Sequence, residues 1–391
     1  MNDDKNPSQL THSQLKILNA GSAVFNKPAT AKDAAFMARE LVQCTLPHKN
    51  PGDVPLWKRT HGNLTLGIQP GMNLKTGKSY GYPYGTIPRL LLFWMITEAI
   101  RTKSRRLELG NSLASFMRQL GLDSNRGGKR GDAKRLRNQM ERLFRSHFSF
   151  EKSYIGENRS GNAWLDMQVA PKGEFWWSEK NPEQANFWGS WIELGEDFYN
   201  AIIAAPVPVD MRILLALKKS PLALDLYAWL VYEAFIANKS GKARFTSFES
   251  LHSQLGSEYA DLDDFRKKGV RPALAKIKAA YQDLKLGKKQ GGIEILPESL
   301  PAIQPRNVTI EGTATEITPR PTMPAPVLVS ALRPLKPRTI ERFRAACGRL
   351  DPYACQSDFE AWLEDKPNER EPKNYDAAFL GFAQKWSISK L

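Results

Sequence analysis

The stretch from Asn111 to Arg145 constrains the fold of this chain most, because it joins two amphipathic helical patterns through a polar turn. In its first half, apolar residues recur at the i, i+3, i+4, i+7 spacing of one helix face, and Gly121 follows as a stop. These residues are Leu113, Phe116, Met117 and Leu120. The second half carries a similar apolar stripe, formed by Leu136, Met140, Leu143 and Phe144. The sequence therefore predicts a short helix, a turn and a second helix, with both apolar faces buried.

The opposite face of the second helix carries planar, forked side chains, namely Arg135, Asn138, Gln139 and Arg142. Arginine matches the edge of guanine in the major groove, and Asn or Gln matches the edge of adenine. The turn and the start of the helix add further cations, namely Arg126, Lys129, Arg130 and Lys134. The alternative is a merely solvated basic helix. We favour a DNA-binding helix-turn-helix because the turn supplies phosphate-binding groups beside the forked side chains.

The charge distribution points to the same stretch. The chain has 56 Lys+Arg and 41 Asp+Glu, a net charge of +15. Residues 101–145 hold 13 Lys+Arg and 4 Asp+Glu, so they contribute 13 − 4 = +9 of this surplus. A surplus of this kind favours a polyanionic partner, either nucleic acid or an anionic membrane. No run approaches the ~18–20 apolar residues of a membrane span, so we expect DNA and no membrane.

The composition gives no sign of disulfides or metal. The three cysteines, Cys44, Cys347 and Cys355, are too few for a disulfide framework and too scattered for a zinc site. The N-terminus lacks the apolar core of a signal peptide. We therefore expect a cytoplasmic protein without metal or cofactor.

The elements around the helix-turn-helix suggest a winged-helix domain over residues 60–180. The helix-turn-helix is preceded by an alternating strand at 64–68, a helix beginning near Pro88 and a short strand in RRLELG. Alternating residues at 148–150 and 165–169, separated by GENRSGN, predict a β-hairpin directly after it. We interpret this hairpin as the wing, with Lys152 and Arg159 near its tip.

The same order recurs over residues 181–297 and predicts a second winged helix. The pattern begins with a strand at 191–194, a helix at 211–218 and a long apolar helix from Pro221. A short helix in SFESLHSQLG and a second helix in DLDDFRKKGVRPALAKIKAAYQDL follow. GGIEIL would begin a smaller wing. The start of the second predicted recognition helix carries Arg266, Lys267, Lys268 and Arg271. Without adjacent amides, these cations favour phosphate binding over base reading, and a solvated basic turn is the alternative. Pro272 requires that the helix begins there or is kinked.

The chain ends look different. Residues 1–59 are predicted to be a flexible arm with one helix at 31–42. Nine of the 26 prolines lie between 297 and 337, which predicts an extended linker over 298–337. Residues 338–391 hold 9 cations and 9 anions and predict a small helical module whose aromatic residues suit contact with another protein. The predicted fold class is therefore α+β, mainly helical, with two tandem winged-helix domains, a linker and a helical C-terminal module.

Two further features of the sequence, a glycine-rich segment and a group of tryptophans, do not indicate a functional site. GMNLKTGKSYGYPYG has five residues between Gly71 and Gly77, whereas a phosphate-binding P-loop needs four. Four tryptophans could stack on bases, but we assign them to the core; they are Trp176, Trp177, Trp188 and Trp191. No carboxylate pair or nucleophile–base set can be assembled. We therefore do not expect an enzyme.

Several of these segments resemble a known family. YGTIPRLLLFWMITEAIRTKSRRLELGNSLASFMRQLGL, followed by GDAKRLRNQMERLFRSHFSF, resembles plasmid-encoded replication initiators of the RepA type. FRKKGVRPALAKIKAAY is similar to the second recognition helix of the Rep winged-helix superfamily. By position, Lys134, Arg135, Asn138 and Arg142 would take the first recognition role, and the cations at 266–271 the second. The turn NRGGKRG is longer than the usual ~3–4 residues, which leaves open where the reading helix begins.

The resemblance implies a protein that binds directly repeated sites (iterons) in double-stranded DNA at a plasmid origin and helps to open the duplex. It further implies recruitment of the host initiator and the replicative helicase machinery in a bacterial cytoplasm, and repression of its own promoter as a homodimer. One alternative keeps the DNA binding but makes the protein a transcriptional regulator or partition factor. A less favoured alternative is a DNA-processing enzyme such as a relaxase or primase.

Overall fold

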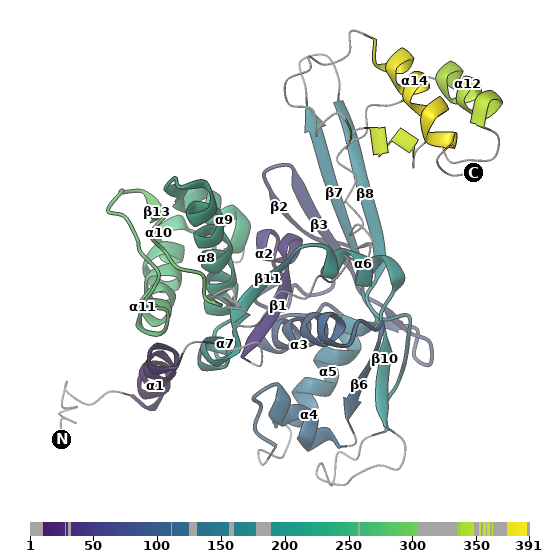
Figure 1. Cartoon of the computed structure of the whole chain (residues 1–391). Coiled ribbons are helices and arrows are strands. Elements are labelled where there is room, and N and C mark those ends of the chain that lie inside the picture. The colour runs from purple at the N-terminus through teal and green to yellow at the C-terminus, as the bar shows by residue number, and fades with distance from the viewer. Residues whose placement is uncertain are drawn as a thin grey trace, which may run out of the picture. The chain divides into compact units, whose positions relative to one another are not determined.

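A computed structural model describes residues 11–27, 29, 33–110, 112–124, 131–155, 160–176, 189–256, 259–303, 335, 337–347, 352, 355–356, 358–359, 362 and 374–388. The chain divides into two compact units, Met1–Thr315 and Glu316–Leu391. The first unit combines helices with several small sheets (Figure 1). The predicted α+β class is confirmed.

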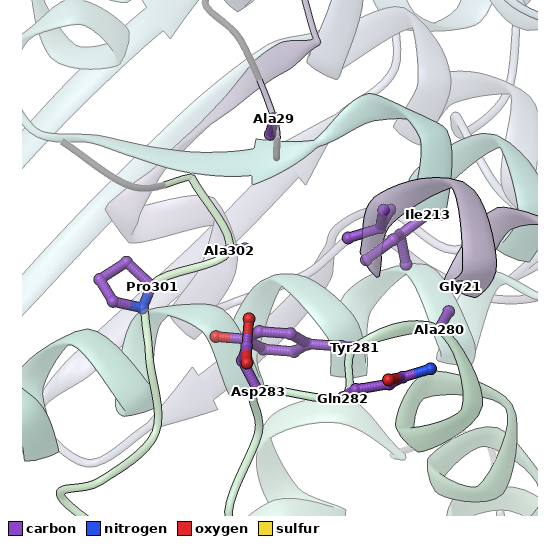
Figure 2. Close-up of a pocket in the computed structure, with 10 residues that line it drawn as sticks. Gly21, Ala29, Ile213, Ala280, Tyr281, Gln282, Asp283, Pro301 and Ala302 are labelled. Carbon is purple, nitrogen blue, oxygen red and sulfur yellow. The ribbon is translucent and has the colours of Figure 1, made fainter. Parts of the chain in front are cut away.

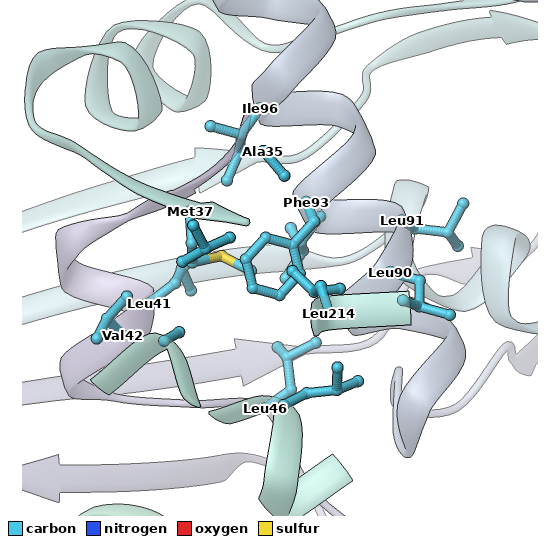
Figure 3. Close-up of a cluster of buried hydrophobic side chains, with 14 of the residues drawn as sticks. Ala35, Met37, Leu41, Val42, Leu46, Leu90, Leu91, Phe93, Ile96 and Leu214 are labelled. Atoms are coloured by element: carbon cyan, nitrogen blue, oxygen red, sulfur yellow. The ribbon is translucent and has the colours of Figure 1, made fainter. Parts of the chain in front are cut away.

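The first unit is built around two long, apolar helices, α3 (Thr86–Thr102) and α8 (Pro221–Ser240). Both are buried nearly all round, as expected for helices that other elements enclose. One continuous hydrophobic cluster extends from Ile17 to Ile295, and Figure 3 shows part of it, where Phe93 of α3 lies beside Met37 and Leu214. The residues predicted as an arm and two separate domains therefore share one core.

The N-terminal region differs from its prediction. It contains α1 (His12–Asn26), β1 (Ala34–Ala38) and α2 (Arg39–Gln43). The predicted helix over 31–42 is wrong in its first part, because β1 pairs antiparallel with β11 (Pro206–Asp210). An alanine-rich segment with both faces covered takes its conformation from this pairing and not from its helix propensity. The flexible arm is also wrong for these residues, since Ile17 and Ala35 are buried.

Both helices of the predicted helix-turn-helix are present. The strand β6 (Arg106–Gly110) leads to α4 (Leu113–Gln119), and α5 (Asp132–Phe144) follows. The Ser112 hydroxyl caps α4 by accepting from the Ser115 N–H at 3.2 Å. Trp94 of α3 packs edge-on against Phe116 of α4, with ring centroids 4.9 Å apart. Every residue of the two predicted apolar stripes is buried, so those predictions are confirmed.

Two sheets flank these helices. The larger has the order β2-β3-β7-β8 and consists of β2 (Trp57–His61), β3 (Leu64–Gln69), β7 (His147–Ile155) and β8 (Ser160–Gln168). The smaller has the order β6-β10-β9 and adds β9 (Lys172–Glu174) and β10 (Ser190–Glu193) to β6. A two-stranded hairpin of β4 (Met72–Asn73) and β5 (Lys78–Ser79) follows β3 along the chain.

The hairpin predicted as the wing therefore lies in a different sheet from β6. Its strand β7 pairs with β3, with Leu66 opposite Phe150, which places Ile68 and Phe148 in the core. The strand that pairs with β6 is β10, where Ile192 lies opposite Leu107. The wing assignment of β7–β8 is wrong, because pairing partners far apart in sequence decide which sheet a strand joins. The same pairing of β6 with β10 crosses the predicted boundary at 180/181.

The second half of this unit contains the predicted elements in their predicted order, together with α6 (Glu196–Ala204) and β11, which were not predicted. It contains α7 (Met211–Leu217), α8, β12 (Arg244–Ser247), α9 (Phe248–Leu255) and β13 (Gly292–Ile295), and β12 pairs with β13. The predicted second recognition helix consists of α10 (Leu262–Asp264), the π-helix η1 (Phe265–Val270) and α11 (Arg271–Ala280). Pro272 lies in the first turn of α11, where a missing N–H costs least. The helical path continues through the wider π turn immediately before it.

The C-terminal unit contains α12 (Pro337–Cys347) and α14 (Tyr375–Ile388), in agreement with the predicted helical module. Its own core includes Phe343, Phe359 and Phe379, all fully buried. The aromatic residues expected on its surface are thus largely structural, although Trp362 is 42% exposed. The three cysteines are free thiols. Within the described ranges, no helix is both long and apolar enough to cross a membrane.

Candidate nucleic-acid interface

The outward face of α5 carries Lys134, Arg135 and Asn138, all exposed as predicted. At about 100° per residue, Lys134 and Asn138 are separated by about 40° around the helix. Arg145, which directly follows α5, lies between them in this projection and is exposed as well. The prediction omitted Arg145 and the exposed Arg137, although both are visible as cations in the same stretch.

Gln139 does not lie on this face. Its side chain is 5% exposed, and its amide oxygen accepts a hydrogen bond from the backbone N–H of Tyr84 at 2.9 Å. The i+4 spacing from Arg135 suggested a shared face, but Gln139 projects toward the buried side with Leu136 and Leu143. The predicted base-reading role of Gln139 is therefore wrong, because its amide stabilises the loop before α3.

Arg142 is also turned toward the protein. Its guanidinium donates to the Tyr82 carbonyl at 3.1 Å and to the Asn138 amide oxygen at 2.8 Å, and it lies over the Tyr84 ring. In this arrangement Arg142 orients Asn138 and does not itself project from the helix. The sequence suggested a second base-reading arginine, whereas the structure supports a positioning role.

The predicted reading helix, whose start the long turn left open, begins at Asp132. The carboxylate of Asp132 accepts from the Asp123 N–H at 3.4 Å and pairs with Arg135 at 3.3 Å, so it connects the two sides of the turn. Arg135 remains 58% exposed, and an exposed pair of this kind is weak enough to exchange for a phosphate. The other predicted cations of the turn, Arg126, Lys129 and Arg130, lie outside the described residues.

The predicted wing cations are not brought to this face by strand pairing. Lys152 is exposed on β7, with its ammonium 5.4 Å from the centroid of the Tyr154 ring. The strand begins just after α5 and extends away from it (Figure 1). Arg159 lies outside the described residues.

The second basic cluster is largely paired with acidic residues. Asp263 binds Arg266 at 2.8 Å and Lys267 at 3.0 Å, and Asp264 binds Lys268 at 2.8 Å. The hydrogen bond from Lys267, followed by the charge of Arg266, lowers the pKa of Asp263. Arg271 is exposed at the first position of α11. The phosphate-binding role was predicted from the cations alone. The acidic residues of DLDD, which lie about one helical turn before them, were not taken into account.

A buried ion pair joins the two long helices. Arg89 of α3 donates to both carboxylate oxygens of Asp225 on α8, at 2.7 Å each, and is 2% exposed. The imidazole of His48 lies 2.8 Å from the same carboxylate. Burial opposes ionisation of Asp225, but the Arg89 charge and the bond with His48 hold its pKa far below the usual range. The sequence did carry a signal, since a charge lies near the start of each apolar helix, and these two charges, Arg89 and Asp225, have opposite signs.

The remaining bonds of Arg89 complete the site. Its guanidinium also donates to the carbonyls of Leu46, Pro47 and Gly85, so all five of its N–H groups are used. These carbonyls belong to the segments that precede β2 and α3. The ion pair therefore fixes α3, which packs against the reading helix α5, relative to α8.

A pocket of about 220 Å³ lies between α1, α7 and the residues after α11 (Figure 2). Its lining includes Gly21, Ile213 and Tyr281. The Tyr281 hydroxyl donates to the Leu300 carbonyl. The lining contains none of the predicted site residues. Elsewhere in the described part of the chain, no group of three or more His, Cys, Asp or Glu is arranged to hold a metal ion.

Comparison with known proteins shows which family part of this chain resembles. No curated protein matches the chain. Two solved structures of RctB domains 2 and 3 show low overall similarity, each with 10% sequence identity. The similarity to one of them covers 66% of this chain and 94% of the RctB chain, with a TM-score of 0.35. The similarity to the other covers 65% of this chain and 94% of the RctB chain, with a TM-score of 0.37. Residues 82–248, which include α3 to α8, match the family of plasmid-encoded RepA proteins. The predicted resemblance to plasmid-encoded RepA proteins is therefore confirmed over this span.

Proposed function

We propose that this protein is a non-catalytic plasmid replication initiator that binds repeated sites in double-stranded DNA through α5. The match of residues 82–248 to the plasmid-encoded RepA family supports a role in plasmid replication. In this proposal, the protein binds iterons at the origin and helps to open the duplex. It also recruits the host initiator and replicative helicase, and acts on its own promoter as a homodimer.

The observation that carries the proposal is the outward face of α5. Lys134, Arg135 and Asn138 project from a helix whose opposite face is fixed in the core by Leu136 and Leu143. A helix anchored in this way can enter the major groove without losing its packing. Arg135 and Asn138 are the base-reading candidates, and Lys134 and Arg145 are placed to bind phosphates.

We interpret the first unit as two helix-turn-helix elements of winged-helix type that share one core. The first consists of α3, β6, α4 and α5, with β9 and β10 in the position of the wing next to β6. The second consists of α8, α9 and the path from α10 to α11, with β12 and β13 as its small sheet. The Arg89–Asp225 pair supports a fixed spacing between the two. Two fixed reading elements suit a site that spans successive major grooves.

The first experiment is selection of bound duplexes from a random library, followed by footprinting of the full chain on plasmid origin DNA. Protection of tandem direct repeats supports initiation. Protection of a lone inverted repeat would instead indicate a transcriptional regulator. Nicking or primer synthesis by the purified protein with a divalent metal would contradict the non-catalytic proposal.

The reading face is tested by the double variant Arg135→Ala/Asn138→Ala. Each lost base contact should reduce discrimination between the selected site and random DNA by about 1–3 kcal/mol, or about 5- to 150-fold. The control variant Lys239→Ala/Lys242→Ala removes two exposed charges, one in the last turn of α8 and one just after the helix. Unchanged discrimination in the α5 variant would exclude α5 as the reading helix.

A further inference from the structure

The β4–β5 hairpin, residues 71–80, is an exposed element beside the reading helix that no predicted role uses. Its four-residue connection from Leu74 to Gly77 presents Lys75 and a leucine that is 92% exposed, and Lys78 is exposed at the start of β5. No acidic residue occurs in the sequence between Asp53 and Glu98. The hairpin therefore combines positive charge with an apolar tip, in a segment with no acidic neighbour along the chain.

The hairpin is attached to the C-terminal end of α5. Gly71 lies so close to Arg145 that a Cβ at position 71 would overlap the Arg145 carbonyl. The Gly71 carbonyl accepts from the Tyr80 N–H at 2.9 Å, which closes the base of the hairpin. Arg145 lies over the Tyr80 ring, with its guanidinium carbon 5.9 Å from the ring centroid. The contacts of Arg142 and Gln139 with residues 82–84 hold the following segment against α5 as well.

The tip of the hairpin is ordered by its own hydrogen bonds. The Asn73 side chain accepts from the N–H groups of Lys75 and Thr76, at 3.0 and 3.2 Å. The Asn73 carbonyl accepts from the Gly77 N–H at 2.8 Å. A short Asx turn of this kind holds Leu74 outward without a long flexible loop. Leu74 is therefore exposed at an ordered tip and does not contribute to the core.

We propose that this hairpin is a second DNA-contacting element, which binds the backbone and the minor groove next to the site read by α5. In this arrangement Lys75 and Lys78 bind phosphates, and Leu74 contacts the sugars and base edges of the groove. Leucine is one of the apolar side chains that proteins insert at base steps to deform a duplex. Duplex DNA is favoured over a protein partner because the apolar tip is flanked by lysines and the hairpin adjoins the cationic end of α5.

The inference rests on the proposed function, and a salt titration separates the two. Each phosphate contact contributes about 0.9 to the slope of log affinity against log salt concentration. The variant Lys75→Gln/Lys78→Gln should therefore lower the slope by about 1.8 and weaken binding about 60-fold at about 0.1 M salt, with the same sequence preference. Leu74→Ser should weaken binding about 10-fold without changing the slope, because the contact is apolar.

The titration uses the full chain with the duplex selected from the random library, followed by fluorescence anisotropy. Lys239→Gln/Lys242→Gln is the charge-matched control, and a thermal unfolding curve shows that each variant is folded. If the wild type lacks salt-dependent, sequence-selective binding, the proposed function fails. If the wild type binds but the hairpin variants keep its affinity and slope, only the hairpin inference is overturned. If Leu74→Ser leaves DNA binding intact and reduces self-association in sedimentation, the hairpin is a protein contact and the inference is also overturned.

Discussion

The substitution Asp225→Asn tests whether the buried ion pair holds the two halves of the first unit together. Asparagine keeps the shape of the side chain but removes the charge that compensates Arg89. Arg89 is 2% exposed and Asp225 is 8% exposed, so solvent cannot replace the lost partner without opening the interface between α3 and α8. Breaking a pair of this kind costs about 3–5 kcal/mol. Such a loss is a large fraction of the about 5–15 kcal/mol that stabilises most domains.

The measurement is urea unfolding at neutral pH, with the free energy of unfolding compared between the wild type and the variant. The pKa of Asp225 is lowered in the folded state, so its contribution is fully present above the ordinary pKa of an aspartate and is lost as the pH falls toward the folded value. The difference between the two proteins should thus be constant from neutral pH to about pH 5 and should shrink below about pH 4.

A double variant distinguishes a lost charge from a damaged fold. Arg89→Met/Asp225→Leu removes both charges and fills a similar volume, so it should cost less than Asp225→Asn alone. A loss below about 1 kcal/mol for Asp225→Asn, which is the range of exposed pairs, would refute the reasoning. A double variant that is less stable than the single one would refute it as well.

Three further predictions concern individual side chains. Gln139→Ala should cost about 1–3 kcal/mol in urea unfolding, because the partly buried Tyr84 N–H loses its acceptor, while base discrimination stays unchanged. Asp263→Asn/Asp264→Asn should release the second basic cluster and raise the salt slope of DNA binding by about 0.9 for each cation that reaches a phosphate. Burial raises the pKa of Cys355 to about 12, so in a thiol-labelling assay at pH 8 it should react only after the C-terminal unit unfolds.

The local patterns in the sequence predicted most of the helices and their buried faces. The stripes of α4 and α5, the apolar helix α8 and the strand β10 all lie where the spacing placed them. Periodicity indicates which face of a segment is apolar. Where one face is clearly more apolar than the other, that face is the one buried in the structure. Periodicity does not determine which strands pair. The sequence therefore predicts the β7–β8 hairpin as the wing, whereas the hairpin pairs with β3 and not with β6.

The candidate site could be predicted only in part, because residue type does not determine which way a side chain turns. Arg135 and Asn138 lie on the outward face, whereas Gln139 and Arg142 are engaged with residues 82–84. Both interactions connect segments more than fifty residues apart in sequence. A helical projection of α5 alone contains no information on this neighbouring loop.

The charge count of residues 101–145 also overstates the DNA-binding surface. Among its described cations, Arg101, Arg105 and Arg106 lie in ion pairs with acids, some of which come from outside the stretch. Arg142 is bonded to a backbone carbonyl. In contrast, Lys75 and Lys78 lie outside this stretch but adjoin the end of α5 through the β4–β5 hairpin. The salt dependence of binding should therefore follow the cations that surround α5 in space and not the surplus of +9 along the chain.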